Sequence, residues 1–270
     1  MKTVLNSFIL TICTFIFFHP TLTSKPIFVF DIHGVLLAED LGSLLKKRIA
    51  ALKKETRSVK ENTYFQQLCT LMKEHKPLGE PAASYSSELY EVPFEVFALF
   101  SGLYTPDHVY AALRSMLAIA RLDEKTLRIL TALVDTIFQH HERVSALTPI
   151  PAGVALLKTC LAQHASDVYI YTNAPTEWVS QYKELFPDIF AHIDDSHLWC
   201  SGSTGLLKPS PEVFTFITQH ANCAITDIIY IDDSAANCAA AHEAGATAIL
   251  FSAPLTAIPP VSDASAKDTK

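Results

Sequence analysis

The second half of the chain alternates short apolar segments with helical segments, and this alternation most strongly limits the possible fold. The apolar segments are 167–173 (DVYIYTN), 227–233 (DIIYIDD) and 247–251 (TAILF), rich in the β-branched and aromatic residues typical of strands. Between them, segments 176–186 and 211–221 have the apolar periodicity of helices. Strands that alternate with helices form a parallel sheet covered by helices on both faces, so we predict an α/β fold.

Polar side chains stand where three of the predicted strands end. They are Asp31, which follows the apolar run 27–30 (IFVF), Thr172 with Asn173, and Asp232 with Asp233. Lys208 lies in the segment between the last two of these strands. In open parallel sheets, ligands bind outside the carboxyl ends of the strands, so these residues are the candidates for a functional site.

The stretch between the first strand and the alternating half shows helical periodicity and little strand signal. Segments 41–54 (LGSLLKKRIAALKK) and 123–139 (DEKTLRILTALVDTIFQ) both repeat apolar residues with the helical period. We therefore expect an α-helical domain over 41–145, inserted into an α/β core domain. The expected limits of the other parts are 25–40 plus 146–253 for this core and 254–270 for a disordered tail.

Composition and charge exclude some classes of function. The chain has 270 residues, 49% of them hydrophobic, which suffices for one large core or two modest ones. With 21 basic against 28 acidic side chains and no basic run, nucleic acid is excluded as a partner. Six cysteines at irregular spacing, without a CxxC pair, indicate neither a disulfide framework nor a zinc site, and are most simply small buried residues.

Residues 1–24 have the pattern of a secretory signal peptide. Lys2 precedes the apolar stretch 4–18, and small residues follow at 21–24. We therefore expect an exported protein, periplasmic or secreted, with no stable membrane anchor once the leader is cleaved. The alternative is an uncleaved segment that anchors the protein, although the stretch is short for a membrane span of about 20 residues.

Four segments, taken in order, resemble the motifs of the haloacid dehalogenase-like (HAD) hydrolase superfamily. Residues 31–35 (DIHGV) are similar to its nucleophile loop, 169–174 (YIYTNA) to its Thr or Ser motif, 206–214 (LLKPSPEVF) to its Lys motif, and 228–237 (IIYIDDSAAN) to its acidic metal motif. The resemblance covers about residues 26–251. It implies a Rossmann-like, doubly wound parallel sheet and, from the helical insert, the branch of the superfamily that carries an α-helical cap.

The resemblance also implies a hydrolytic reaction and a role for each candidate residue. Asp31 would attack phosphorus and form an aspartyl phosphate, which splits one difficult step into two. Lys208 would place a fixed positive charge between the nucleophile and the phosphoryl group. The Thr172 hydroxyl and the backbone N–H of Asn173 would hold a phosphate oxygen. The implied substrate is a small phosphorylated compound.

A divalent cation is part of this implied chemistry, because the nucleophile and the phosphoryl group are both anions. Mg²⁺ prefers a few carboxylates together with water and substrate phosphate. The implied ligands are Asp31 and Asp233, the backbone carbonyl of His33, and Asp232 or Asn237, direct or through water.

His33 departs from the pattern of the superfamily, whose phosphatases usually have a second Asp two residues after the nucleophile. That Asp protonates the leaving alcohol and later deprotonates the attacking water. In one interpretation His33 is itself the acid and base of a phosphomonoesterase, because its ordinary pKa of about 6.5 suits both tasks.

Two other interpretations of His33 remain open. In the second, the reaction needs no such acid, as in a dehalogenase or another non-phosphatase hydrolase. The pair Asp232 and Asp233 argues against a dehalogenase, since neighbouring acids without a cation repel each other. In the third, the site is catalytically impaired, and the exported protein binds a phosphorylated ligand or a partner.

Two further motifs are interpreted as structural. A second Asp-Asp-Ser, at 194–196, is not preceded by an unbroken apolar run, so we expect solvated loop residues with a capping role. The segment 140–142 (HHE) places its two histidines about 100° apart on a helix, which favours a solvated helix end over a metal site.

Overall fold

The structure is a computed structural model that describes residues 25–40, 61–81, 93–138 and 146–252. Four predicted features lie outside the described residues, namely the leader at 1–24, the helix at 41–54, the segment 140–142 and the tail at 254–270. Within the four described ranges, no helix combines the length and the apolar character needed to cross a bilayer.

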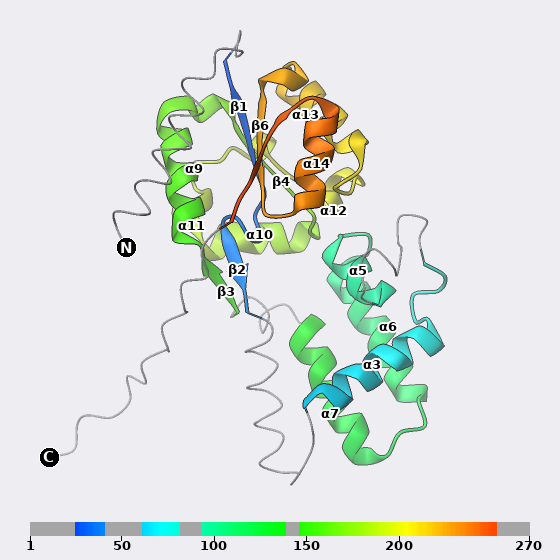
Figure 1. Cartoon of the computed structure of the whole chain (residues 1–270). Helices are drawn as coiled ribbons and strands as arrows, with labels where there is room; N and C mark the ends of the chain where they lie inside the picture. Colours follow the sequence, from blue (N-terminus) through cyan, green and yellow to red (C-terminus); the bar gives the residue numbers. More distant parts are fainter. Residues whose placement is uncertain (1–24, 41–60, 82–92, 139–145, 253–270) are drawn as a thin grey trace, which may run out of the picture.

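A five-stranded parallel sheet forms the centre of the core (Figure 1). Its strands are β1 (Ile27–Phe30), β4 (Val168–Thr172), β5 (Leu198–Cys200), β6 (Ile228–Asp232) and β7 (Thr247–Leu250). Their order is β5-β4-β1-β6-β7, and every neighbouring pair is parallel. The predicted α/β fold with a parallel sheet is therefore confirmed. The sequence did not predict β5, because it has only three residues and follows directly on the polar segment 192–197.

Helices cover both faces of the sheet, because alternate strand residues point to opposite sides. Phe28 and Phe30 of β1 belong to one apolar cluster, and Ile27 and Val29 belong to the other. The first cluster includes residues of α9 (Pro151–His164), α10 (Thr176–Leu185) and α11 (Pro187–Phe190). The second includes residues of α13 (Pro211–Ala221) and α14 (Ala235–Ala244). Burial on both faces explains why the strands read as nearly continuous apolar runs.

The core helices begin and end at residues that favour these positions. Pro151 and Pro211 stand at the first positions of α9 and α13, where the missing N–H costs nothing. The Ser234 hydroxyl caps α14 by accepting a hydrogen bond from the Asn237 N–H at 3.4 Å. The short elements between them are η1 (Ala165–Asp167), η2 (Asp195–His197), α12 (Ser201–Thr204) and η3 (Ile225–Asp227).

A helical insert separates two short antiparallel strands, β2 (Leu37–Glu39) and β3 (Leu147–Pro149). Its described helices are α3 (Glu61–His75), α5 (Phe94–Phe100), α6 (Pro106–Ile119) and α7 (Glu124–Phe138). We use the name helical insert for residues 61–138. Its helices contact one another through buried residues such as Leu68, Leu113 and Leu133. Because β2 pairs with β3, the chain leaves the core and returns to it at adjacent points.

The loop after α5 packs directly on the core. The Ser201 hydroxyl accepts a hydrogen bond from the Ala174 N–H at 3.0 Å and donates one to the Ser101 carbonyl. Next to it, Gly102 has φ +72°, and a Cβ there would lie 2.7 Å from the Ala174 carbonyl oxygen. The backbone of the insert therefore approaches the segment that follows β4 more closely than any side chain would allow.

This close approach predicts that Gly102→Ala is more destabilising than the same substitution at Gly205. Gly205 has φ +70° and nothing within 4 Å of an added Cβ, so both variants carry the same conformational penalty. Only Gly102→Ala also pushes the insert away from Ala174. We expect its free energy of unfolding, measured by urea denaturation, to fall about 2 kcal/mol further than that of Gly205→Ala. Equal losses would mean that this contact is not made in solution.

Candidate active site

The register of the central strands places two aspartates side by side. Phe30 of β1 is paired with Ile231 of β6, so Asp31 and Asp232 are the next pair along the ladder. The Asp31 N–H continues this ladder by donating to the Ile231 carbonyl at 2.9 Å. Both aspartates are buried, and both stand at the carboxyl end of the sheet. Two neighbouring carboxylates in a buried position require a cation between them.

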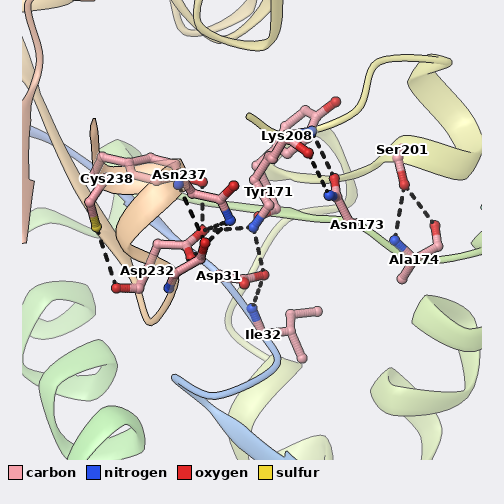
Figure 2. A network of polar contacts seen from close by, with 12 residues as sticks. Asp31, Ile32, Tyr171, Asn173, Ala174, Ser201, Lys208, Asp232, Asn237 and Cys238 are labelled. Carbon is pink, nitrogen blue, oxygen red and sulfur yellow. Dashed lines mark hydrogen bonds and ion pairs between the residues drawn. The ribbon is translucent and has the colours of Figure 1, made fainter. Parts of the chain in front are cut away.

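Lys208 supplies the positive charge between these two carboxylates (Figure 2). Its Nζ lies 3.0 Å from Asp31 Oδ1 and 2.8 Å from Asp232 Oδ2. The same ammonium group donates to the Tyr171 carbonyl at 3.3 Å. Its three protons therefore have three acceptors, which satisfies a lysine that is only 2% exposed.

The segment that carries Lys208 is fixed by the residue after β4. The Asn173 side chain accepts a hydrogen bond from the Lys208 backbone N–H at 3.0 Å and donates one to the Lys208 carbonyl, also at 3.0 Å. Thr172, the last residue of β4, is 1% exposed and directly precedes Asn173. The residue that follows β4 therefore determines the position of the segment that carries Lys208.

Asp232 accepts hydrogen bonds on both carboxylate oxygens. The Tyr230 hydroxyl donates to Oδ2 at 2.8 Å, and the Ser234 N–H donates to Oδ1 at 2.8 Å. The Asn237 amide reaches both oxygens, at 3.0 and 3.1 Å. With Lys208 as a further donor, Asp232 is held in a single orientation.

Asp233 approaches the loop that follows β1 at a glycine. Gly34 has φ +75°, and a Cβ there would lie 1.9 Å from Asp233 Oδ2, so the site requires glycine at this position. Asp31, Asp232 and Asp233 each offer a carboxylate oxygen, and these three oxygens lie within 4.8 Å of one another. In the described part of the chain they form the one group of three or more acidic, His or Cys side chains with this spacing. Such a set of oxygen donors is suited to a hard divalent cation.

The buried charges shift one another's pKa. Burial, opposed by Lys208 and reinforced by Asp232, raises the pKa of Asp31 from 3.8 to about 6. Burial also raises the pKa of Asp232, but the ion pair and hydrogen bond with Lys208 outweigh it, so the net pKa is lowered. Asp233 has a raised pKa through burial and through the charge of Asp232. Burial lowers the pKa of Lys208, but Asp31 and Asp232 raise it above its ordinary value. The site therefore holds an excess of negative charge.

His33 stands two residues after Asp31 in the same loop and contacts a core helix. Its Nε2 lies 3.1 Å from the hydroxyl oxygen of Tyr182, in α10. The two rings meet edge to face, with centroids 5.5 Å apart. The imidazole is thus held by a residue of the helix that follows Asn173.

Most of the residues predicted from the sequence come together in this structure. One connected group contains Asp31, Asp232, Asp233, Asn237, Lys208 and Asn173, and Thr172 is adjacent in sequence to Asn173. Their catalytic and metal-binding roles stay predictions. Sequence reasoning missed Tyr230, Tyr182 and Ser201. Tyr230 had a signal, because it precedes Asp232 by two residues and so shares its face of the strand. Tyr182 and Ser201 had none.

The interpretation of 194–196 as a solvated loop is confirmed. Asp194 is exposed and caps η2 by accepting from the Ser196 N–H at 2.9 Å, and Asp195 pairs with Lys183 on the surface. The cysteines follow expectation in part. Five of the six cysteines lie in the described ranges, and these five are free thiols; Cys160, Cys200 and Cys238 are buried, and Cys69 and Cys223 are half-buried.

Comparison with known proteins identifies the class to which this fold and site belong. A family model described as haloacid dehalogenase-like hydrolase matches residues 26–245. The chain therefore belongs to the haloacid dehalogenase-like hydrolases, as its four motifs predicted. No curated protein sequence matches the chain.

Solved structures of other HAD family proteins are similar to this chain, and the first one described here shares its fold. A HAD family enzyme from Bacteroides thetaiotaomicron, in complex with magnesium and inorganic phosphate, is 18% identical with a TM-score of 0.53; the match covers 84% of this chain and 93% of that one. A HAD family hydrolase from Deinococcus radiodurans R1, with bound phosphate and sodium, is 17% identical with a TM-score of 0.45, covering 83% and 79% of the two chains. A putative HAD hydrolase from Bacillus subtilis, bound to magnesium, is 18% identical with a TM-score of 0.47, covering 83% and 88%.

The shared lysine predicts a pH-dependent loss of stability in Lys208→Met. Without the ammonium group, two buried carboxylates face each other, and we expect the free energy of unfolding at about pH 8 to fall by about 3–5 kcal/mol. A carboxyl whose folded-state pKa is raised destabilises the fold only above its ordinary pKa. Lys208 lowers the pKa of Asp31, so in Lys208→Met this carboxyl takes up its proton above pH 6, and the deficit should shrink as the pH falls from about 8 toward about 6.

Urea denaturation at about pH 8 and about pH 5 measures this effect. The control is Lys183→Met, which removes a surface ion pair with Asp195 and should cost less than about 1 kcal/mol at both values. A deficit of Lys208→Met that does not depend on pH would contradict the buried ion-pair geometry.

Proposed function

We propose that this protein is a Mg²⁺-dependent phosphomonoesterase that acts through an aspartyl-phosphate intermediate on a small phosphorylated substrate. The observation that carries the proposal is the position of Asp31. Its carboxylate lies at the carboxyl end of the central strand, beside the buried Lys208 and within reach of two more acids. This arrangement suits phosphoryl transfer, where catalysis is mainly positioning and charge neutralisation.

The acidic group fits a magnesium ion, because the three oxygens converge and carry more negative charge than Lys208 balances. We assign Asp31, Asp233 and the backbone carbonyl of His33 as direct ligands. Asp232 and Asn237 would act through water, since the oxygens of Asp232 already accept several hydrogen bonds. When bound, the ion would neutralise the carboxylates and the phosphate oxygens that approach each other. The Bacteroides enzyme with the same fold was crystallised with both magnesium and inorganic phosphate, which supports this assignment.

The remaining site residues have complementary roles. Lys208 orients Asp31 and lowers the cost of placing its charge next to Asp232. The Thr172 hydroxyl and the Asn173 backbone N–H bind a phosphate oxygen, and the clamp between the Asn173 side chain and the Lys208 backbone keeps both segments in register.

His33 takes the place of the usual second Asp as general acid and base. A histidine can donate and accept a proton near neutral pH, as the two halves of the reaction require. The position of Asp233 against Gly34, where it converges with Asp31 and Asp232, supports a metal-dependent phosphatase over a metal-free dehalogenase. Three convergent carboxylates without a cation would repel one another. An intact connected site argues against an impaired binding protein.

We propose that the helical insert is the cap that selects the substrate. Phe94 and Phe97 of α5 pack against Leu207, the residue next to Lys208 in sequence. Phe100 packs edge to face on Trp178 of α10, with ring centroids 5.5 Å apart. The insert thus contacts two segments that flank the site.

The nucleophile is tested by Asp31→Asn. We expect the purified protein to hydrolyse p-nitrophenyl phosphate with Mg²⁺, to lose activity in EDTA and to regain it when Mg²⁺ is restored. Asp31→Asn should lower kcat by more than about a thousandfold, because no aspartyl phosphate can form. The control Asp195→Asn, at the exposed loop, should keep wild-type activity. Metal-independent halide release from a haloacid would instead assign the dehalogenase reaction.

The proton-transfer role is tested by substitutions of His33. We expect His33→Ala to lower kcat for an alkyl phosphomonoester by about a hundredfold or more, because the leaving alkoxide no longer receives a proton. His33→Asp should retain activity, and a severalfold increase would show that histidine is the poorer acid at this position. An unchanged rate in His33→Ala, measured at saturating substrate and Mg²⁺, would rule out His33 as acid and base.

A further inference from the structure

Tyr182, in α10, makes a polar contact with the side chain of His33. The Tyr182 side chain is 1% exposed, and its hydroxyl oxygen lies 3.1 Å from His33 Nε2. The rings are nearly perpendicular, at 89°, so the contact constrains both the position and the plane of the imidazole. The two residues are 149 positions apart in sequence, and only the fold brings them together.

The helix that makes this contact, α10, also contacts the helical insert. Trp178 and Tyr182 are four residues apart, so they share one side of the helix. Trp178 meets Phe100 of the insert, and Tyr182 meets His33. The imidazole therefore contacts the same side of α10 that contacts the insert.

We propose that Tyr182 is a positioning residue for His33: its hydroxyl holds Nε2, so that the proton is exchanged at Nδ1. The inference rests on the phosphomonoesterase function proposed above. An imidazole that must give a proton in one step and take one in the next has to present the same nitrogen twice. A hydrogen bond to the other nitrogen fixes which one that is. In this assignment the His33 ring carries a proton on Nε2 in both protonation states, and Nε2–H donates to the Tyr182 oxygen.

The two half-reactions balance with this assignment. In the first, a bond forms between Asp31 and phosphorus while the bond from phosphorus to the alcohol oxygen breaks. The alcohol oxygen keeps that electron pair and takes the proton from Nδ1 of the His33 imidazolium. In the second, water attacks phosphorus and gives its proton to Nδ1. The Asp31–phosphorus bond breaks, and its electron pair returns to the carboxylate.

The test is Tyr182→Phe, which keeps the ring packing and removes only the hydroxyl. The probes are glycerol 2-phosphate, whose alkoxide needs a proton to leave, and p-nitrophenyl phosphate, whose phenolate does not. In single-turnover measurements of bond cleavage with Mg²⁺, we expect the rate for glycerol 2-phosphate to fall about tenfold or more. The rate for p-nitrophenyl phosphate should change by less than about twofold. Equal losses for both substrates, or no loss for either, would overturn the inference.

Two further variants separate positioning from a structural role. Tyr110→Phe is the matched control, because it removes a hydroxyl that donates to Asp135 at 2.8 Å between α6 and α7. It should lose comparable stability and show no dependence on the leaving group. His33→Ala combined with Tyr182→Phe should be no slower on glycerol 2-phosphate than His33→Ala alone, since Tyr182 acts through His33. Additive losses would overturn the inference.

A measurement without substrate tests the same contact. In ¹⁵N–¹H correlation spectra of the full chain, the neutral His33 ring should carry its proton on Nε2, and this preference should weaken in Tyr182→Phe. A proton on Nδ1 in the wild type would overturn the inference. If the wild type hydrolyses neither probe, the proposed function fails and the inference with it. If His33→Ala shows the leaving-group dependence and Tyr182→Phe does not, only the role of Tyr182 fails.

Discussion

Two buried carboxylates share one buried ammonium group, and the arrangement of the whole site depends on this contact. Asp31 and Asp232 are neighbours because β1 and β6 pair in parallel with a fixed register. Lys208 lies between them and uses its third donor on the Tyr171 carbonyl of β4. One side chain thus connects the ends of three adjacent strands. A buried charge must be paired, so any change in the position of one member changes the other two.

The loops around this ion-pair group are fixed by contacts that leave little freedom. Asn173 clamps the backbone of Lys208 on one side, and Tyr230, Ser234 and Asn237 orient Asp232 on the other. Asp233 reaches the loop that follows β1 only because Gly34 has no side chain. The acidic group is therefore preorganised, and the raised pKa of Asp31 reflects the cost of holding it there. Such electrostatic strain is typical of sites that bind a cation or perform chemistry.

The helical insert and the core meet through backbone and aromatic contacts close to this site. Ser201 links the segment after β4 to Ser101 of the insert, and Phe100 packs on α10. The helix that receives Phe100 also holds His33 through Tyr182. One side of α10 therefore contacts both the insert and the His33 imidazole.

The amino-acid sequence by itself determined the fold class, four of the five sheet strands and the residues at their ends. These follow from local patterns, since apolar runs, helical periodicity and end-of-strand acids are all visible within about ten residues. The three-residue strand β5 and the pair β2 and β3 were missed because segments this short carry no periodic signal. Only the tertiary structure decided that Lys208 is shared by two acids, that Asn173 clamps the segment that carries Lys208 and that His33 meets Tyr182. Each of these contacts joins residues from separate segments of the chain, and their distances depend on strand register and helix packing, which no local pattern encodes.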